Sequence, residues 1–185
     1  MKKMLLHVCC APCLTSVFER LKAETDYEIT LFFSNSNILP KAEYERRKDA
    51  LIAFVSQAHK DTTIIFDEYQ PAEFFEAIAG KERLGEGSER CGSCIGYRLM
   101  KTVKYAKENG FDIFATTLSV SPHKNAALIN GLGRELSEKY GIEFFEADFK
   151  KRDGYLRSLQ ICKEYQIYRQ NYCGCNLDQG VKNEL

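Results

Sequence analysis

The sequence lacks features that mark several common classes of protein. Its 26 lysine and arginine residues balance 26 aspartate and glutamate residues, so any contact with nucleic acid needs local patches rather than a global positive field. It has no long apolar run, and Lys2-Lys3 leads directly into a short strand-like segment. We therefore expect neither a signal peptide nor a membrane span, and we expect a cytoplasmic protein.

Motifs of two catalytic classes are also missing. The first expected strand is followed by Cys9-Cys10-Ala11-Pro12-Cys13 instead of a glycine-rich phosphate loop, which argues against the use of ATP through that loop. The chain has only 3 histidines and no visible Ser/His/Asp set. Hydrolysis by a nucleophilic serine is therefore not indicated.

Cysteine, by contrast, is abundant, with 8 residues in a chain of 185. A chain of this length can form a single domain, residues 1–185, that buries most of its surface and needs no disulfide bonds for stability. A cytoplasmic location also disfavours structural disulfides, so we expect the cysteines to bind a soft metal or to carry electrons. They form three groups and one outlier assigned to the core: Cys9-Cys10 with Cys13, Cys91-x-x-Cys94, Cys173-Gly174-Cys175, and Cys162.

Strand-like and helix-like segments alternate along the chain. The expected strands are 3–8, 27–33, 62–66, 112–116 and 143–145. The expected helices are 12–22, 40–59, 71–79, 91–109, 123–140 and 158–165. Ser121-Pro122 is read as the N-cap and first residue of the fifth helix. This order predicts a three-layer α/β domain with a parallel five-stranded sheet. Sites in such folds form at the carboxyl ends of strands, so residues 9–10, 34–40 and 117–123 are expected to line one crevice.

Cys9, Cys10, Cys91 and Cys94 offer four thiolates from two separate segments. A turn at a helix N-terminus lowers thiol pKa values, which favours the thiolate that binds metal. Four thiolates complete either a tetrahedral zinc site or a four-iron cluster, and Cys-x-x-Cys also occurs in dithiol redox sites. Zinc ligands usually come as two spaced pairs, whereas adjacent thiolates can reach different irons. The Cys9-Cys10 doublet therefore favours a cluster.

Cys173 and Cys175 form a separate pair. Two cysteines one residue apart can lie within disulfide reach, and Gly174 relieves the tight ring. Such a strained disulfide is easily reduced, which suits a redox-active pair. Metal ligation and plain packing of the tail are the alternatives.

Basic residues gather locally, and most such runs are solvated faces. The stretch around Arg169, between Tyr168 and Tyr172, is more suggestive, because its planes can stack on an unpaired RNA base. The other basic groups are Arg46-Arg47-Lys48, Lys101 with Lys104 and Lys107, and Lys150-Lys151-Arg152.

Together these elements resemble one family, the QueH-type epoxyqueuosine reductases, over nearly the whole chain. The stretches that carry the resemblance are 6–12 (LHVCCAP), 35–38 (NSNI) with Glu43-Tyr44-x-x-Arg47, Arg90-Cys91-x-x-Cys94 with Arg98-Leu99, 116–118 (TTL) with Ser121-Pro122, 148–151 (DFKK) with Asp153-Gly154, and 168–175 (YRQNYCGC).

The resemblance implies reduction of epoxyqueuosine to queuosine at the wobble base of tRNA, the last step of queuosine biosynthesis. It implies a HUP-like Rossmann fold, a [4Fe-4S] cluster and no cobalamin, with an additional iron and the electron donor left open. Cys9, Cys10, Cys91 and Cys94 would be the cluster ligands, and Cys173 and Cys175 the redox-active pair. Cys13 matches less securely and receives no role.

Two other functions remain open from the residues alone. One is a thiol–disulfide oxidoreductase without a cluster. The other is a zinc-stabilised RNA-binding module without catalysis. Visible absorption and metal content discriminate among the three.

Overall fold

The computed structural model describes residues 1–177, so residues 178–185 of the expected domain lie outside it. Its centre is a five-stranded, all-parallel sheet of order β3-β2-β1-β4-β5, which confirms the predicted α/β class. The strands are β1 (Lys3–His7), β2 (Glu28–Phe33), β3 (Ile64–Phe66), β4 (Ile113–Thr116) and β5 (Glu143–Phe144). The strand order reverses between β1 and β4, and such a switch point opens a crevice at the carboxyl ends of the strands.

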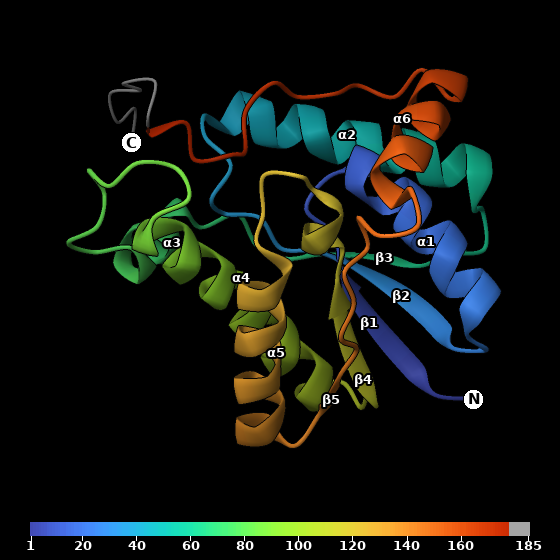
Figure 1. The fold of residues 1–185 in the computed structure, drawn as a ribbon, viewed down its shortest axis with the longest axis horizontal. Coiled ribbons are helices and arrows are strands. Elements are labelled where there is room, and N and C mark those ends of the chain that lie inside the picture. Colours follow the sequence, from blue (N-terminus) through green and yellow to red (C-terminus); the bar gives the residue numbers. More distant parts are fainter. Residues whose placement is uncertain (178–185) are drawn as a thin grey trace.

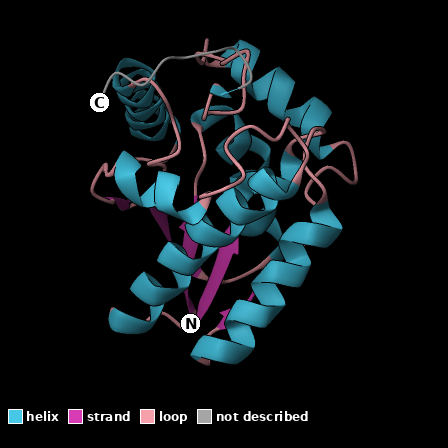
Figure 2. Ribbon diagram, turned by 90° about the vertical axis from the view of Figure 1, so that its left-hand side faces the viewer, coloured by secondary structure: helices cyan, strands magenta, loops and turns pink. Residues whose placement is uncertain are grey.

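Helices cover both faces of this sheet, so that the strands lie in the interior in both views (Figures 1 and 2). The alternation of side chains along β1 sends Met4 and Leu6 to one face and Leu5 to the other, and all three are fully buried. One face packs against α1 (Ala11–Glu24), α2 (Lys41–Ala58) and α6 (Gly154–Glu164). The other packs against α4 (Glu89–Glu108) and α5 (Ala126–Tyr140), and the short α3 (Pro71–Ala77) lies against α4.

One expected helix begins later than the sequence suggested. Ser121-Pro122 does not start α5; a single 3-10 turn, η1 (Thr117–Val120), follows β4, and residues 121–125 form a loop. Helix α5 is capped instead by Asn125, whose side chain accepts hydrogen bonds from the backbone N–H groups of Ala127 and Leu128. Two N–H groups satisfied by one side chain make Asn125 the better cap. The displaced loop reaches the crevice.

No helix within residues 1–177 is long and apolar enough to cross a bilayer. The helices bury one face each against the sheet, whose central strands are buried on both faces, and the largest buried side chains belong to these elements. The functional groups lie above this core, at the carboxyl ends of the strands.

Candidate metal and dithiol site

Three thiols gather where β1 meets α1. Cys9 follows the strand, Cys10 is the N-cap residue of α1 with extended backbone, and Cys13 lies in the first turn of the helix. Their sulfur atoms all lie within 4.8 Å of one another, and the Cys9 and Cys10 sulfurs are 3.8 Å apart. Cys10 and Cys13 meet because residues three apart share one face of a helix. Among residues 1–177 this is the one such group of three or more potential metal-binding side chains.

The thiol triad, Cys9, Cys10 and Cys13, is arranged so that one sulfur is readily ionised. Hydrogen bonds from the thiols of Cys10 and Cys13 hold the pKa of Cys9 well below its ordinary value, and the Thr117 hydroxyl donates to the same sulfur at 3.4 Å. A hydrogen bond from Cys13 lowers the pKa of Cys10, but its hydrogen bond to Cys9 and its burial outweigh this and raise it to about 12. Hydrogen bonds to Cys10 and Cys9, together with burial, raise the pKa of Cys13. A thiophilic cation takes the place of the remaining protons on such a triad.

His7 supports this turn from below and stays neutral. It is fully buried, and burial, followed by the charge of Arg98, lowers its pKa to about 3. Its Nε2 lies 3.3 Å from the carbonyl oxygen of Ser34, which can only accept, so Nε2 carries the proton. Its Nδ1 then accepts from the Thr116 hydroxyl at 2.9 Å. His7 is therefore a core residue with both ring nitrogens hydrogen-bonded.

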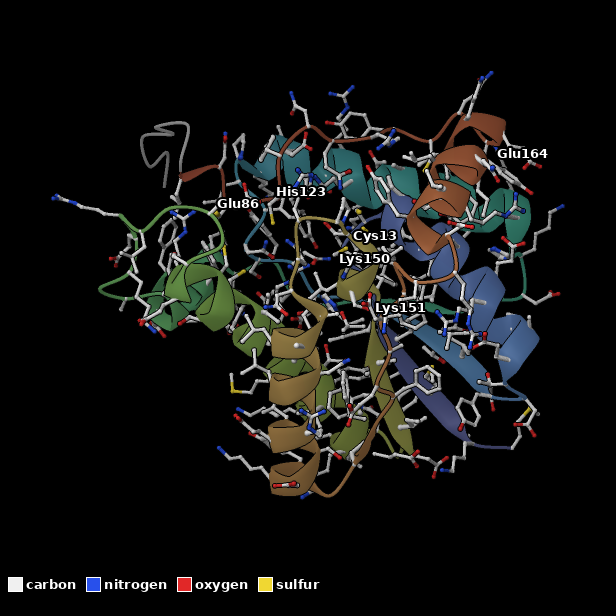
Figure 3. All side chains as sticks on the ribbon, viewed as in Figure 1. Cys13, Glu86, His123, Lys150, Lys151 and Glu164 are labelled. Carbon is white, nitrogen blue, oxygen red and sulfur yellow. The ribbon has the colours of Figure 1, made fainter. Side chains whose placement is uncertain are left out.

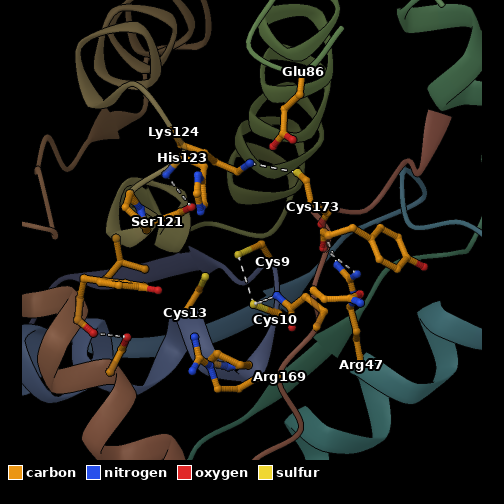
Figure 4. Close-up of a pocket in the computed structure, with 18 of the residues that line it drawn as sticks. Cys9, Cys10, Cys13, Arg47, Glu86, Ser121, His123, Lys124, Arg169 and Cys173 are labelled. Carbon is orange, nitrogen blue, oxygen red and sulfur yellow. Dashed lines mark hydrogen bonds between the residues drawn. The ribbon is translucent and has the colours of Figure 1, made fainter. Parts of the chain in front are cut away.

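The thiol triad opens into a cavity of about 420 Å³, shown in Figure 4. Loop residues Ser121, His123 and Lys124 line it from the η1 side, and Arg169 and Cys173 line it from the C-terminal tail. Figure 3 shows Cys13, Glu86 and His123 in the same region above the carboxyl ends of the strands. The structure therefore confirms that the segment after β1 and the segment after β4 line one crevice.

Cys91 and Cys94 lie in the first turns of α4 and do not join the thiol triad. They line a smaller neighbouring cavity of about 80 Å³ together with Cys173 and Cys175. Burial raises the pKa of Cys94 to about 12, and the Cys91 sulfur accepts a hydrogen bond from the backbone N–H of Gly87 at 3.3 Å. Cys173 lines both cavities and so lies between the two groups of thiols.

Arg47 fixes the Cys173-Gly174-Cys175 segment over the loop that follows β2. Its guanidinium is only 2% exposed, donates to the carbonyl oxygens of Cys173 at 2.7 Å and Tyr172 at 3.1 Å, and pairs with Glu43 at 2.8 Å. The N–H of Leu39 donates to the Gly174 carbonyl at 2.9 Å. Residues of α2 and of the preceding loop thus hold a segment that is more than a hundred positions away in the sequence.

The two cysteines of this segment differ in their surroundings. Cys173 is exposed, and the Lys124 ammonium donates to its sulfur at 3.0 Å. Burial tends to lower the pKa of Lys124, but the charge and hydrogen bond of Cys173 raise it, so the ammonium is retained. Cys175 packs against Phe74 and Ile78, and this burial raises its pKa. Both carry free thiols.

Gly174 offers a direct test of this placement. A β-carbon at this position would lie 2.8 Å from the Nδ2 of buried Asn37, so we expect Gly174→Ala to displace the segment, to lower the free energy of unfolding by about 1–3 kcal/mol and to slow turnover roughly tenfold. The matched control is Gly131→Ala in α5, where no atom lies within 4 Å and alanine stabilises helices by about 0.5–1 kcal/mol. Thermal unfolding and steady-state rates decide; a Gly174→Ala protein that matches the Gly131→Ala protein contradicts the placement.

Sequence reasoning missed four groups around the thiols. Cys13, which received no role, completes the triad, and its spacing of three from Cys10 in a helix was the available signal. Gln170 donates to the Cys10 sulfur at 3.0 Å. Gln170 and Arg98 lie in stretches that carry the family resemblance but received no role, and Lys124 comes from a segment with no local motif. Cys162 is buried on α6, as expected.

Arg98 shows that the space between the thiols suits an anionic group. Its side chain is buried and lines both cavities, and one amino group donates to Asn35 at 2.6 Å. Its Nε has no hydrogen-bond partner among the residues described. A buried, unsatisfied N–H beside several thiols is stabilised by a negatively charged ligand such as an iron–sulfur cluster with its thiolates. The residues present therefore fit such a group.

Fold and site together define a parallel α/β protein with a triad of thiols that can hold a metal ion at the carboxyl ends of its strands. The family described as epoxyqueuosine reductase QueH matches residues 4–179. The chain is 47% identical over 176 residues to an epoxyqueuosine reductase QueH of Streptococcus pyogenes, with 93% of this chain and 68% of the relative covered. It is 40% identical to the one of Thermotoga maritima, covering 95% of this chain and 89% of the relative. The chain belongs to the QueH family.

Proposed function

We propose that this protein is an epoxyqueuosine reductase that converts epoxyqueuosine to queuosine at the wobble position of tRNA, the last step of queuosine biosynthesis. Family membership over nearly the whole chain supports the reaction. The observation that carries it is the concentration of cysteines at the switch point of the sheet, where Cys9, Cys10 and Cys13 lie within 4.8 Å of one another beside a cavity that Cys173 also lines.

We propose Cys9, Cys10, Cys91 and Cys94 as ligands of a [4Fe-4S] cluster. Such a cluster supplies electrons singly, and an exposed iron acts as a Lewis acid on an oxygen. The Arg98 guanidinium lines both cavities and would offset the negative charge of a cluster and its thiolates. Cys91 and Cys94 lie in the first turns of α4, the helix that also carries Arg98. Cys13 is the candidate ligand for an additional iron. We propose no cobalamin, because the proposed ligands are all cysteine thiolates, which suit iron.

We propose Cys173 and Cys175 as the redox-active pair. Removal of the epoxide oxygen as water leaves an alkene and takes two electrons and two protons. Oxidation of two thiols to one disulfide releases two electrons and two protons, so the overall reaction balances. Lys124 holds the Cys173 sulfur at 3.0 Å on the cavity side, and Arg47 holds its backbone. An external donor then returns the disulfide to two thiols.

The proposed reaction can be tested on anaerobically purified full-length protein. We expect a broad visible absorption that bleaches on reduction, and conversion of epoxyqueuosine to queuosine in an anticodon stem-loop, measured as loss of one oxygen by mass spectrometry. A colourless, zinc-loaded protein that binds the RNA without converting it would point to a binding module. A metal-free protein that only exchanges thiols would point to a thiol–disulfide oxidoreductase.

The structure narrows which basic residues can contact tRNA. The Lys150 ammonium already has partners within the protein: it donates to the carbonyl oxygens of Ser119 and Lys124 and pairs with Asp148. Other members of the basic groups form ion pairs within the protein as well: Arg47 with Glu43, Lys101 with Asp67 and Glu73, and Arg152 with Glu24. Arg169 and Lys151 are exposed, and neither makes an ion pair with the described residues. Tyr168, which precedes Arg169, lies under the Arg46 guanidinium, 3.8 Å from the ring centroid.

We therefore expect an Arg169→Gln/Lys151→Gln protein to bind tRNA more weakly. Each lost phosphate contact should reduce the slope of log affinity against log salt by about 0.7–0.9, because fewer counterions are released. Binding titrations at several salt concentrations measure this, and the visible absorption should not change. Arg157→Gln is the control, since Arg157 is exposed but paired with Glu19. Equal slopes for both proteins contradict the proposed RNA surface.

We further propose that residues 1–185 act as one domain in the cytoplasm. One sheet carries both helical layers, and α6 with the tail packs on the same core through Ile161 and Tyr165. Free thiols at a redox site are retained in a reducing compartment, where tRNA modification also occurs.

A further inference from the structure

The charged side chains that line the 420 Å³ cavity beside the thiol triad are basic, with a single exception. Among the described residues that line it, the arginines, the lysine and the histidine face one acidic side chain, Glu86, which also lines the smaller cavity. The cationic residues of this cavity are Arg47, Arg98, Lys124 and Arg169, and His123 lies among them. A carboxylate in such surroundings is expected to pair with one of them.

Glu86 nevertheless pairs with none of the described residues. It lies on the loop between α3 and α4, where Gly87 adopts a φ of +83°, and the N–H of Ser88 bonds to the carbonyl oxygen of Gly85 at 3.3 Å. The Gly87 N–H donates to the Cys91 sulfur, which anchors the turn beside the thiols. Figure 4 shows the Glu86 carboxylate pointing into the cavity, on the side of Lys124 and Cys173. Its charge is therefore available to a ligand.

The substrate of the proposed reaction carries one cation that matches this carboxylate. In epoxyqueuosine a secondary amine joins the methyl group on the deazaguanine base to the epoxide-bearing cyclopentane ring, and near neutral pH this amine is an ammonium. The lactam, the ring hydroxyls and the epoxide are neutral. A carboxylate and an alkylammonium form a charge-assisted hydrogen bond, which is stronger than a neutral one. No other acidic residue among those described lines either cavity.

We propose that Glu86 binds the linker ammonium of epoxyqueuosine. Glu86 thereby selects the modified nucleoside over guanosine and directs the epoxide ring towards Cys173, which lines the same two cavities. This inference rests on the proposed function and deepens it. The surrounding arginines and lysine disfavour binding of the linker ammonium elsewhere in the cavity, because like charges repel.

Binding of an anticodon stem-loop that carries queuosine tests the proposal, because the product keeps the linker ammonium. We expect the full-length protein to prefer this RNA to the same RNA with guanosine, and Glu86→Gln to lose roughly tenfold or more of that preference. The wild-type preference should fall as pH rises through the deprotonation of the amine, while that of Glu86→Gln stays flat. Glu86→Asp should restore part of it.

Glu89→Gln is the matched control, because Glu89 follows three residues later and lines a separate groove with Gly92 and Leu128. It should keep the wild-type preference and its pH dependence. A Glu86→Gln protein with unchanged preference, or with the wild-type pH profile, overturns the assignment. Turnover of epoxyqueuosine by the wild-type protein is measured separately, so that a failure of the reductase function is told apart from a failure at Glu86.

Discussion

Replacement of Cys9, Cys10, Cys91 or Cys94 by serine, one at a time, should remove iron and abolish turnover. Iron in a cluster prefers the soft thiolate to a hard hydroxyl, so we expect affinity for the metal to fall by about 100-fold or more. Iron content, visible absorption and conversion of epoxyqueuosine are the measurements.

Cys13 and Cys162 make this experiment decisive. Cys162→Ala removes a buried thiol of α6 that lines neither cavity, so it should keep full iron and turnover. Cys13→Ser tests the thiol that the structure adds to the site. If Cys91→Ser retained all iron and activity while Cys13→Ser lost both, the metal would belong to the triad of Cys9, Cys10 and Cys13, and the proposed ligand set would be wrong.

A Cys173→Ala/Cys175→Ala double variant should separate the two thiol functions. We expect it to keep iron and visible absorption, because both residues enter from the tail and neither belongs to the triad. It should lose repeated reduction of epoxyqueuosine, since no dithiol remains to supply or relay the electrons. Single-turnover and multiple-turnover experiments measure the two steps separately.

Each alternative for this pair predicts a different result. Loss of the iron absorption in the double variant would mean that the pair ligates metal. Full multiple turnover would mean that it only packs the tail. Lys124→Met is a useful companion, because it removes the ammonium at 3.0 Å from the Cys173 sulfur and leaves both thiols in place. We expect it to slow repeated turnover without loss of iron.

Much of the fold follows from local patterns in the sequence. The apolar run before Cys9 and the β-branched segment at 62–66 predict strands, and the alternation with amphipathic helices predicts the parallel sheet that is observed. The start of α5 was misplaced, because Ser121-Pro122 and Asn125 are both good helix starts and only the hydrogen bonds that each can make distinguish them. That shift moves His123 and Lys124 from a helix into the wall of the cavity.

Part of the site was also accessible from sequence. Cys9 and Cys10 had to lie at a strand end, where parallel α/β folds place their sites, and Cys162 had to be buried on a helix face. The expected role of Cys173 and Cys175 depended on their spacing alone. None of these inferences required knowledge of which distant segments meet.

The sequence by itself determined the α/β class, the strand-end position of Cys9 and Cys10 and the kinship of the chain, since these depend on residues that are neighbours along it. The tertiary structure alone decided that Cys13 joins the triad, that Arg47 holds the Cys173 backbone from 126 positions away, and that Glu86 faces the cavity. Such contacts depend on how helices and loops pack on the sheet. A local pattern cannot specify them, because the same motif can be presented to many different partners.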